Sequence, residues 1–196
     1  VVSLPFFWAM NDSTDSTWTI ENYQARGLKG NLNYRYRLSE QSYGEFNTAY
    51  IQDGAIGQEL REAKLNLGDT EKIQRSSIKY RHYYELPEGY VQRTDINWVS
   101  DILYPKDFPN DIAGHGDPAM VSRVSVTKNS NSQHASVEIA HNRNMIAGAG
   151  VAYDSPNKPK DPRNADDTSI QRFPVINYNI MPQELPLGIL FEFDSR

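Results

Sequence analysis

The fold is decided by the stretch Gly30-Asn31-Leu32-Asn33-Tyr34-Arg35-Tyr36-Arg37-Leu38-Ser39, in which apolar and polar side chains alternate without a fault. Alternation of period two is typical of a β-strand that has one apolar and one polar face. A tilted strand of about ten residues is also long enough to cross a lipid bilayer. The stretch therefore predicts a strand of the kind that builds transmembrane barrels.

Similar segments recur along the whole chain and predict further strands. We predict strands in the opening segment and at 16–23, 30–39, 44–52, 77–84, 90–99, 121–128, 133–141, 173–180 and 187–194. Short turns separate several of them, such as Leu86-Pro87-Glu88-Gly89, where proline and glycine supply the backbone angles of a reversal. We therefore predict an all-β chain of about ten strands that pair successively in an antiparallel up-and-down meander. The product would be an incomplete transmembrane β-barrel.

Three longer stretches interrupt the alternation. Residues 53–72 are too many for a hairpin turn, and a short helix on the rim is predicted there from four apolar residues on one helical face: Ile56, Leu60, Ala63 and Leu67. Residues 102–119 and 154–168 are rich in proline or glycine, so we predict an irregular loop for the first and a flexible loop for the second. No second composition class appears, so residues 1–196 are expected to form a single, incomplete domain, excerpted from a longer protein.

The composition narrows the class of protein. A net charge of −5 argues against a nucleic-acid binder, which usually carries a basic surplus. The chain lacks a run of about 18 apolar residues and so has no candidate for a spanning helix. A mean hydropathy of −0.67 remains compatible with a barrel, because only alternate residues of its strands face lipid. The 12 tyrosines, 7 phenylalanines and 3 tryptophans suit the aromatic girdles of such barrels.

The sequence gives no sign of catalytic or metal chemistry. Ser100 and Asp101 adjoin, but a catalytic pair would need a positioned base, normally histidine, and no spacing supplies one. The four histidines and the acidic stretch 161–167 lack the spacing of zinc or calcium ligands. Cysteine is absent, so no disulfide framework is expected, and no phosphate-binding loop is present. We predict that the protein is not an enzyme and holds no metal or cofactor.

Four tracts of the chain, taken in order, resemble the LptD family of lipopolysaccharide-assembly proteins. The first is Leu4-Pro5-Phe6-Phe7-Trp8-Ala9-Met10-Asn11-Asp12, followed by Asp15-Ser16-Thr17 and Arg26-Gly27. The second is Tyr34-Arg35-Tyr36-Arg37, with Gly44-Glu45-Phe46 and Tyr50-Ile51-Gln52-Asp53. The third and most specific runs from Asn97 to Phe108, and the last is Gln171-Arg172-Phe173-Pro174-Val175-Ile176, with Phe173 where the family usually has leucine.

The resemblance implies the N-terminal portion of an outer-membrane barrel that inserts lipopolysaccharide into the outer leaflet. It also implies an LptE-like lipoprotein plug in the lumen and an LptA-like periplasmic bridge, which binds a jelly roll that is absent from this piece. In this family the first and last strands meet at a weak seam. Pro5, with Phe6 and Phe7, is a candidate for that lateral gate, because proline cannot donate to a strand ladder. The alternative is that Pro5 merely starts the strand.

Two further groups of residues are candidates for function. Five cations lie opposite the apolar face and would line the lumen: Arg35, Arg37, Lys79, Arg81 and Arg93. They could bind the phosphates of lipopolysaccharide, or simply pair with Glu45, Asp95 or a plug protein. A structural motif is predicted on the periplasmic rim, formed by Ser100, Asp101, Tyr104, Asp107 and Phe108.

Two other functions compete with lipopolysaccharide transport. A generic porin-like or import barrel would share the alternation and the aromatic girdles. A soluble β-sandwich could instead bind carbohydrate through Trp18, Trp98 and tyrosines, with its apolar faces buried between two sheets.

Overall fold

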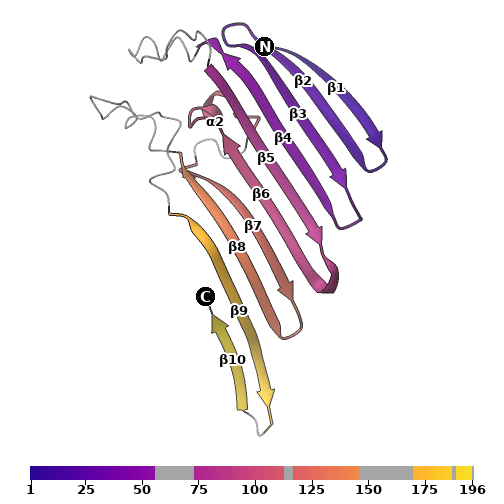
Figure 1. Cartoon of the computed structure of the whole chain (residues 1–196), viewed down its shortest axis with the longest axis vertical. Helices are drawn as coiled ribbons and strands as arrows, with labels where there is room; N and C mark the ends of the chain where they lie inside the picture. Colours follow the sequence, from indigo (N-terminus) through magenta and orange to yellow (C-terminus); the bar gives the residue numbers. More distant parts are fainter. Residues whose placement is uncertain (56–72, 113–116, 146–169, 187–188, 196) are drawn as a thin grey trace, which may run out of the picture.

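A computed structural model describes residues 1–55, 73–112, 117–145, 170–186 and 189–195. These residues form one antiparallel sheet in which each of ten strands pairs with the next along the chain (Figure 1). The strands are β1 (Val2–Asn11), β2 (Thr14–Tyr23), β3 (Gly27–Arg37), β4 (Tyr43–Asp53), β5 (Ile73–Glu85), β6 (Tyr90–Val99), β7 (Ala119–Asn129), β8 (Gln133–Asn144), β9 (Arg172–Leu185) and β10 (Ile189–Ser195). The predicted all-β meander of about ten strands is confirmed. Among the described residues no pairing joins β1 to β10, so the sheet is open, as an incomplete barrel requires.

The strand bounds differ from the predicted ones at several ends. Strand β5 begins at Ile73 rather than Ser77, because its register with β4 continues to the pair Asp53–Ile73. Leu38 and Ser39 were expected to end β3 but lie in the turn, where the Leu38 N–H donates to the Ser42 carbonyl at 2.7 Å. Period two alone does not mark these ends, since the pairing partner decides how far a strand extends.

A 3-10 turn and a short α-helix accompany the sheet in the described part of the chain. The 3-10 turn η1 (Pro87–Gly89) makes the predicted reversal between β5 and β6, with Glu88 and Gly89 at positive φ. Helix α2 (Tyr104–Asp107) lies within 102–119, so the prediction of a wholly irregular loop is wrong there. Pro105 stands in the first turn of α2, where a missing N–H costs no helical hydrogen bond. Residues 56–72 of the stretch 53–72, for which a rim helix is predicted, lie outside the described residues, as does the whole loop predicted at 154–168.

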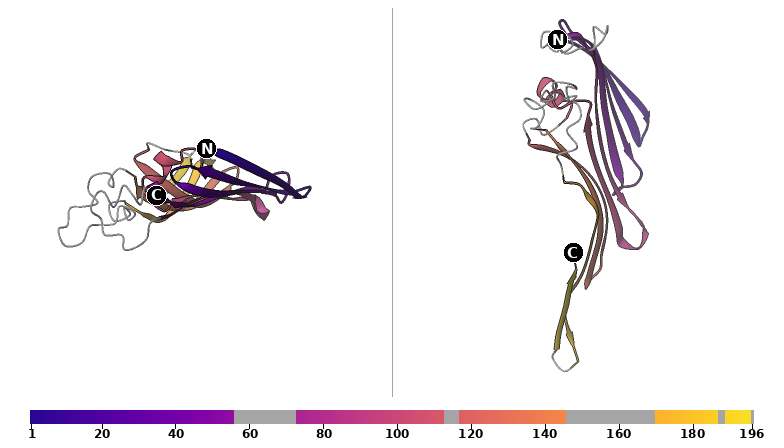
Figure 2. Two further views of the ribbon diagram at one scale, coloured as in Figure 1. Left: turned by 90° about the horizontal axis from the view of Figure 1, so that it is seen from above. Right: turned by 60° about the vertical axis from the view of Figure 1, so that its left-hand side comes forward.

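The sheet is a single layer, and α2 lies on one side of it (Figure 2). We call the face that α2 covers the inner face and the opposite face the outer face. One row across the outer face is apolar except on β4, where Thr48 stands between Leu32 and Ile78. Its apolar members are Phe6, Trp18, Leu32, Ile78 and Trp98. Phe6 is 63% exposed and Trp18 47%, and no second sheet covers them in the part of the chain that is described. A sandwich needs two sheets, so the described residues do not form one.

One aromatic cluster on the outer face joins three strands. The Tyr36 hydroxyl lies 2.7 Å from the Tyr80 hydroxyl and 2.7 Å from Nδ1 of His82. The Tyr36 ring lies over Gly44, where a Cβ would overlap it. The small residue on β4 therefore lets a ring from β3 reach its partners on β5.

The main apolar core of the described residues lies between α2 and the inner face. It contains Ile51, Val99, Tyr104, Phe108, Ile112 and Met120. Among the described residues no helix is long and apolar enough to cross a membrane.

Candidate functional site on the inner face

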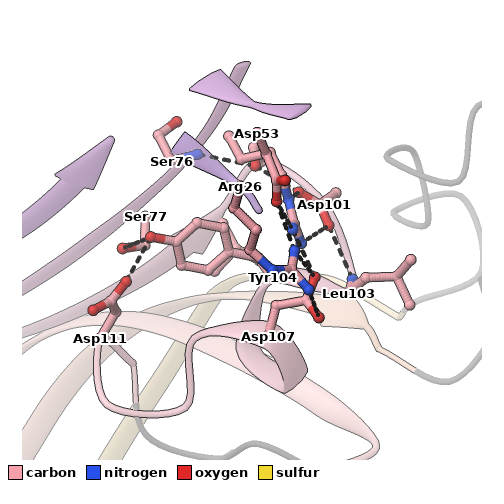
Figure 3. Close-up of polar contacts among 12 residues, drawn as sticks. Arg26, Asp53, Ser76, Ser77, Asp101, Leu103, Tyr104, Asp107 and Asp111 are labelled. Atoms are coloured by element: carbon pink, nitrogen blue, oxygen red, sulfur yellow. Dashed lines mark hydrogen bonds and ion pairs between the residues drawn. The ribbon is translucent and has the colours of Figure 1, made fainter. Parts of the chain in front are cut away.

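A buried ion-pair cluster fixes segment 100–112 to the inner face (Figure 3). Its centre is Arg75 on β5, whose side chain is fully buried. The Arg75 guanidinium donates to Asp101 from Nε at 2.9 Å and from Nη2 at 2.8 Å. Its Nη1 donates to Asp53 at 2.8 Å and to Asp107 at 2.6 Å. One cation thus joins the end of β4 to both sides of α2.

Arg26, in the turn between β2 and β3, shares two of these carboxylates. It donates to Asp53 at 2.7 Å and to Asp107 at 2.9 and 3.1 Å. Burial by itself would lower the pKa of Arg26, but the hydrogen bonds and negative charge of Asp53 and Asp107 raise the pKa above its usual value. The turn after β2 is therefore held to the same cluster as β5 and α2.

A second group of contacts lies beside the first. The buried Lys29 ammonium donates to Asp111 at 2.6 Å and to Glu21 at 3.1 Å. The Tyr104 hydroxyl donates to the other oxygen of Asp111 at 2.6 Å. Burial, followed by this hydrogen bond, raises the pKa of Tyr104.

Phe108 packs against the charges of both groups. Its ring lies 4.8 Å from the Lys29 ammonium, and 5.5 and 5.4 Å from the guanidinium carbons of Arg26 and Arg75. Such cation–π contacts stabilise by about 0.5–2 kcal/mol each. We call these residues together the rim cluster: Glu21, Arg26, Lys29, Asp53, Arg75, Asp101, Tyr104, Asp107, Phe108 and Asp111. Each of its three cations, Arg26, Lys29 and Arg75, is bound to carboxylates. That its role is structural stays a prediction.

The five predicted lumen cations all lie on the inner face, but they differ in their partners. Arg35 pairs with Asp15 at 2.9 Å. Within the described residues, no carboxylate lies within 4 Å of the other four, Arg37, Lys79, Arg81 and Arg93. The predicted alternative of pairing with Glu45 or Asp95 is therefore not formed.

Those two carboxylates bind amides instead. Glu45 accepts from Asn33 at 2.7 Å and from Asn47 at 3.0 Å. Asp95 accepts from Asn97 at 3.0 Å. Arg81 lies directly opposite both acids in the register, yet its guanidinium forms no ion pair with either.

A groove of about 630 Å³ opens on the inner face beside Arg81. Arg93 and Arg123 also line it, together with Tyr43 and Tyr83. The two tyrosine rings stack at 5.7 Å between centroids, and the Arg93 guanidinium lies 5.4 Å from the Tyr83 ring. Arg123 pairs with Glu138 at 3.4 Å, so two of the three arginines, Arg81 and Arg93, form no ion pair with a described carboxylate. The groove therefore places these two cations beside a stacked aromatic pair.

The sequence model of the family described as LPS transport system D, LptD, matches residues 73–196, which is more than half of the chain. The chain belongs to the LptD family. Its matched part contains Arg75, α2, Arg81 and Arg93, so much of the rim cluster and of the groove lies within the family region. Pro5, Phe6 and Phe7 precede that region.

Three curated relatives agree with this membership, and each is named LPS-assembly protein LptD. The chain is 28% identical over 111 residues to the protein of Shewanella frigidimarina, covering 57% of this chain and 13% of that one. It is 25% identical over 138 residues to the Vibrio vulnificus protein, covering 70% of this chain and 16% of that one. It is 27% identical over 112 residues to the Nitrosospira multiformis protein, covering 57% and 10%. The match thus spans less than a fifth of each of these LptD proteins.

The tract predicted as a motif, Ser100 to Phe108, forms one side of the rim cluster in this LptD-family chain. Asp101, Tyr104, Asp107 and Phe108 make the contacts described above, and the Ser100 hydroxyl donates to Asp101 at 2.8 Å. That the cluster lies on the periplasmic side stays a prediction.

Sequence reasoning missed the other side of the rim cluster, formed by Arg26, Lys29, Asp53, Arg75 and Asp111. A signal for part of it was available, because Arg26 and Asp53 lie within two of the tracts that resemble the LptD family. Lys29 and Arg75 stand opposite Ile51 on the two neighbouring strands, which only the register reveals.

The gate candidates lie on the edge strand β1. Pro5 stands opposite Thr19, and the register of β1 with β2 passes through it without a shift. Phe6 and Phe7 point to opposite faces and are 63% and 58% exposed. Their role in an LptD-type gate stays a prediction.

Proposed function

We propose that this chain is the N-terminal portion of an outer-membrane barrel that transports lipopolysaccharide and inserts it into the outer leaflet. The observation that carries the proposal is the match of the LptD family to residues 73–196, together with relatives named as LPS-assembly proteins. The physical form agrees with it. Most of the strands have 10 to 14 residues, enough to cross a bilayer when tilted. The outer face exposes the apolar row that lipid would cover.

The proposed mechanism is gated passage without bond chemistry. Strand β1 is an edge of the sheet, and in the complete barrel it would pair with a strand outside these residues. Pro5 has no N–H to donate, so a seam at β1 would lack one of the backbone donors that another residue would offer there. Phe6 and Phe7 would then flank the opening, one towards lipid and one towards the lumen.

The proposed partners follow from the two faces and from the family. Membrane lipid covers the outer face. An LptE-like plug would contact the polar inner face, and an LptA-like bridge would deliver lipopolysaccharide through a jelly roll outside this chain. The inner face supports a plug because its exposed cations and amides can form hydrogen bonds with a polar protein surface.

We also propose that the rim cluster lies at the periplasmic end of the barrel. A chain that enters β1 from the periplasm reaches that side again after β6, where segment 100–112 begins. The lengths of the connections favour the opposite side, because barrels usually keep short turns in the periplasm and long loops outside. Here the longer connections, 54–72, 100–118 and 145–171, share the end that holds the rim cluster. Labelling from outside the cell distinguishes the two orientations.

The first test is to purify the full-length gene product from outer membranes. We expect it to require detergent and to bring down lipopolysaccharide and a small lipoprotein. A product that stays folded in plain buffer and carries no lipopolysaccharide would overturn the proposal. A detergent-dependent product that carries no lipopolysaccharide and conducts small solutes in liposomes would favour the porin-like alternative.

A further inference from the structure

In the groove beside Arg81, two inner-face cations that form no ion pair with a described carboxylate lie next to stacked aromatic rings. Arg81 and Arg93 line it, and within the described residues neither guanidinium lies within 4 Å of a carboxylate. Arg93 makes one weak polar contact among the described residues, a 3.4 Å donation to the Thr127 hydroxyl. Both groups therefore keep most of their donors available. Arg75 and Lys29 differ, since the rim cluster occupies their donors.

The guanidinium N–H donors of Arg81 and Arg93 favour a ligand that carries a phosphate. A guanidinium presents planar N–H donors that match the oxygens of a phosphate by paired, charge-assisted hydrogen bonds. Such bonds are about twice as strong as neutral ones. A ligand phosphate placed between Arg81 and Arg93 would neutralise charges that Glu45 and Asp95 leave unpaired.

The rest of the groove suits a sugar. Tyr43 and Tyr83 form a flat stacked pair at its side, and an aromatic face packs well against the C–H face of a saccharide ring. Glu45, Asp95 and Glu138 also line the groove. Asparagines bind the first two and Arg123 binds the third, and the remaining acceptor sites of these carboxylates can receive hydrogen bonds from sugar hydroxyls. A volume of about 630 Å³ falls in the range of small-ligand sites and holds one to two sugar rings.

We propose that this groove binds a phosphate-bearing saccharide, with Arg81 and Arg93 on the phosphate and the Tyr43–Tyr83 pair against the ring. The inference rests on the proposed function and deepens it, because it assigns the phosphorylated sugar part of the transported lipid to a defined set of inner-face residues. It also separates these residues from Arg35, which is paired with Asp15 and takes no part.

The test uses the full-length protein in the outer membrane with a photo-crosslinking residue in place of Ser125. Ser125 lines the groove and stands opposite Arg93 on the neighbouring strand. We expect an adduct with lipopolysaccharide. The double variant Arg81→Gln and Arg93→Gln should lower its yield at least fivefold, since charged hydrogen bonds are lost. The matched control Arg35→Gln should leave the yield within twofold. Glucosamine 1-phosphate, added to the purified complex, should reduce the adduct more than glucosamine does.

The outcomes separate the inference from the function on which it rests. The proposed saccharide site would be overturned if the double variant left the adduct yield unchanged, or if the adduct contained a protein in place of lipopolysaccharide. Co-purified lipopolysaccharide would in either case still support transport. Equal competition by glucosamine and its phosphate would overturn the assignment of the phosphate to the arginines. Absence of lipopolysaccharide from the purified protein would instead refute transport itself. Heat-shifted migration of each variant in detergent gels shows that the barrel has folded.

Discussion

Replacing Arg75 by methionine should loosen segment 100–112 from the inner face. Methionine fills a similar volume, but it leaves Asp53 and Asp101 buried without their shared cation. Removing one partner of a buried ion pair costs about 3–5 kcal/mol. The lower end applies here, since Asp53 keeps its 2.7 Å bond from Arg26 and Asp101 keeps the Ser100 hydroxyl at 2.8 Å. We therefore expect about 3 kcal/mol.

The loss is measured by native-state proteolysis of the full-length protein in detergent. When opening is fast relative to cleavage, the cleavage rate follows the population of the open segment. About 3 kcal/mol corresponds to a roughly hundredfold faster cleavage within 100–112. The control Arg35→Met removes an exposed pair with Asp15 and should change the rate less than about fivefold. A rate for Arg75→Met that lies within the range of this control would refute the reasoning about the rim cluster.

Three further predictions concern the rim cluster and the outer face. The pKa of Tyr104 is raised above the ordinary value of 10.0, so Tyr104 keeps its proton in the folded state while the unfolded chain loses it, and the free energy of unfolding should fall as the pH rises above about 10. The variant Tyr104→Phe should lose this part of the dependence of the unfolding free energy on pH, and an unchanged dependence would contradict the prediction. Gly44→Ala should cost about 1–3 kcal/mol in thermal or urea unfolding because its Cβ displaces the Tyr36 ring, whereas Gly30→Ala, with nothing within 4 Å, should cost less than about 1 kcal/mol. Asn110→Cys should react with a membrane-impermeant maleimide only after the outer membrane is opened, and labelling in intact cells would place the rim cluster outside.

The fold was predictable from the sequence because one property decides it. In β3 every second side chain from Leu32 to Tyr36 is apolar, and a sheet with lipid on one face enforces that pattern over each strand. Strand ends were less predictable, as Ile73 and Leu38 show. A strand ends where its pairing with the neighbouring strand ends, and the alternation within one segment does not determine that pairing register.

The candidate site was predictable only in part for the same reason. The tract Ser100 to Phe108 is contiguous, so its unusual composition stands out in the sequence. The cations that it binds come from β3, β5 and a turn, and only folding brings Arg26, Lys29 and Arg75 to one place. Likewise, the sequence suggested that Arg81 pairs with Glu45 or Asp95. In the structure these two carboxylates accept hydrogen bonds from asparagine side chains instead.

The most direct test of the central claim is to deplete the full-length protein in its own cells and measure newly made lipopolysaccharide on the cell surface. Antibody labelling of intact cells after a pulse of radiolabelled sugar reports the amount that has reached the outer leaflet. We predict that surface lipopolysaccharide falls while the newly made lipid accumulates inside, and that the wild-type gene restores it. Unchanged delivery of lipopolysaccharide in depleted cells would contradict the account.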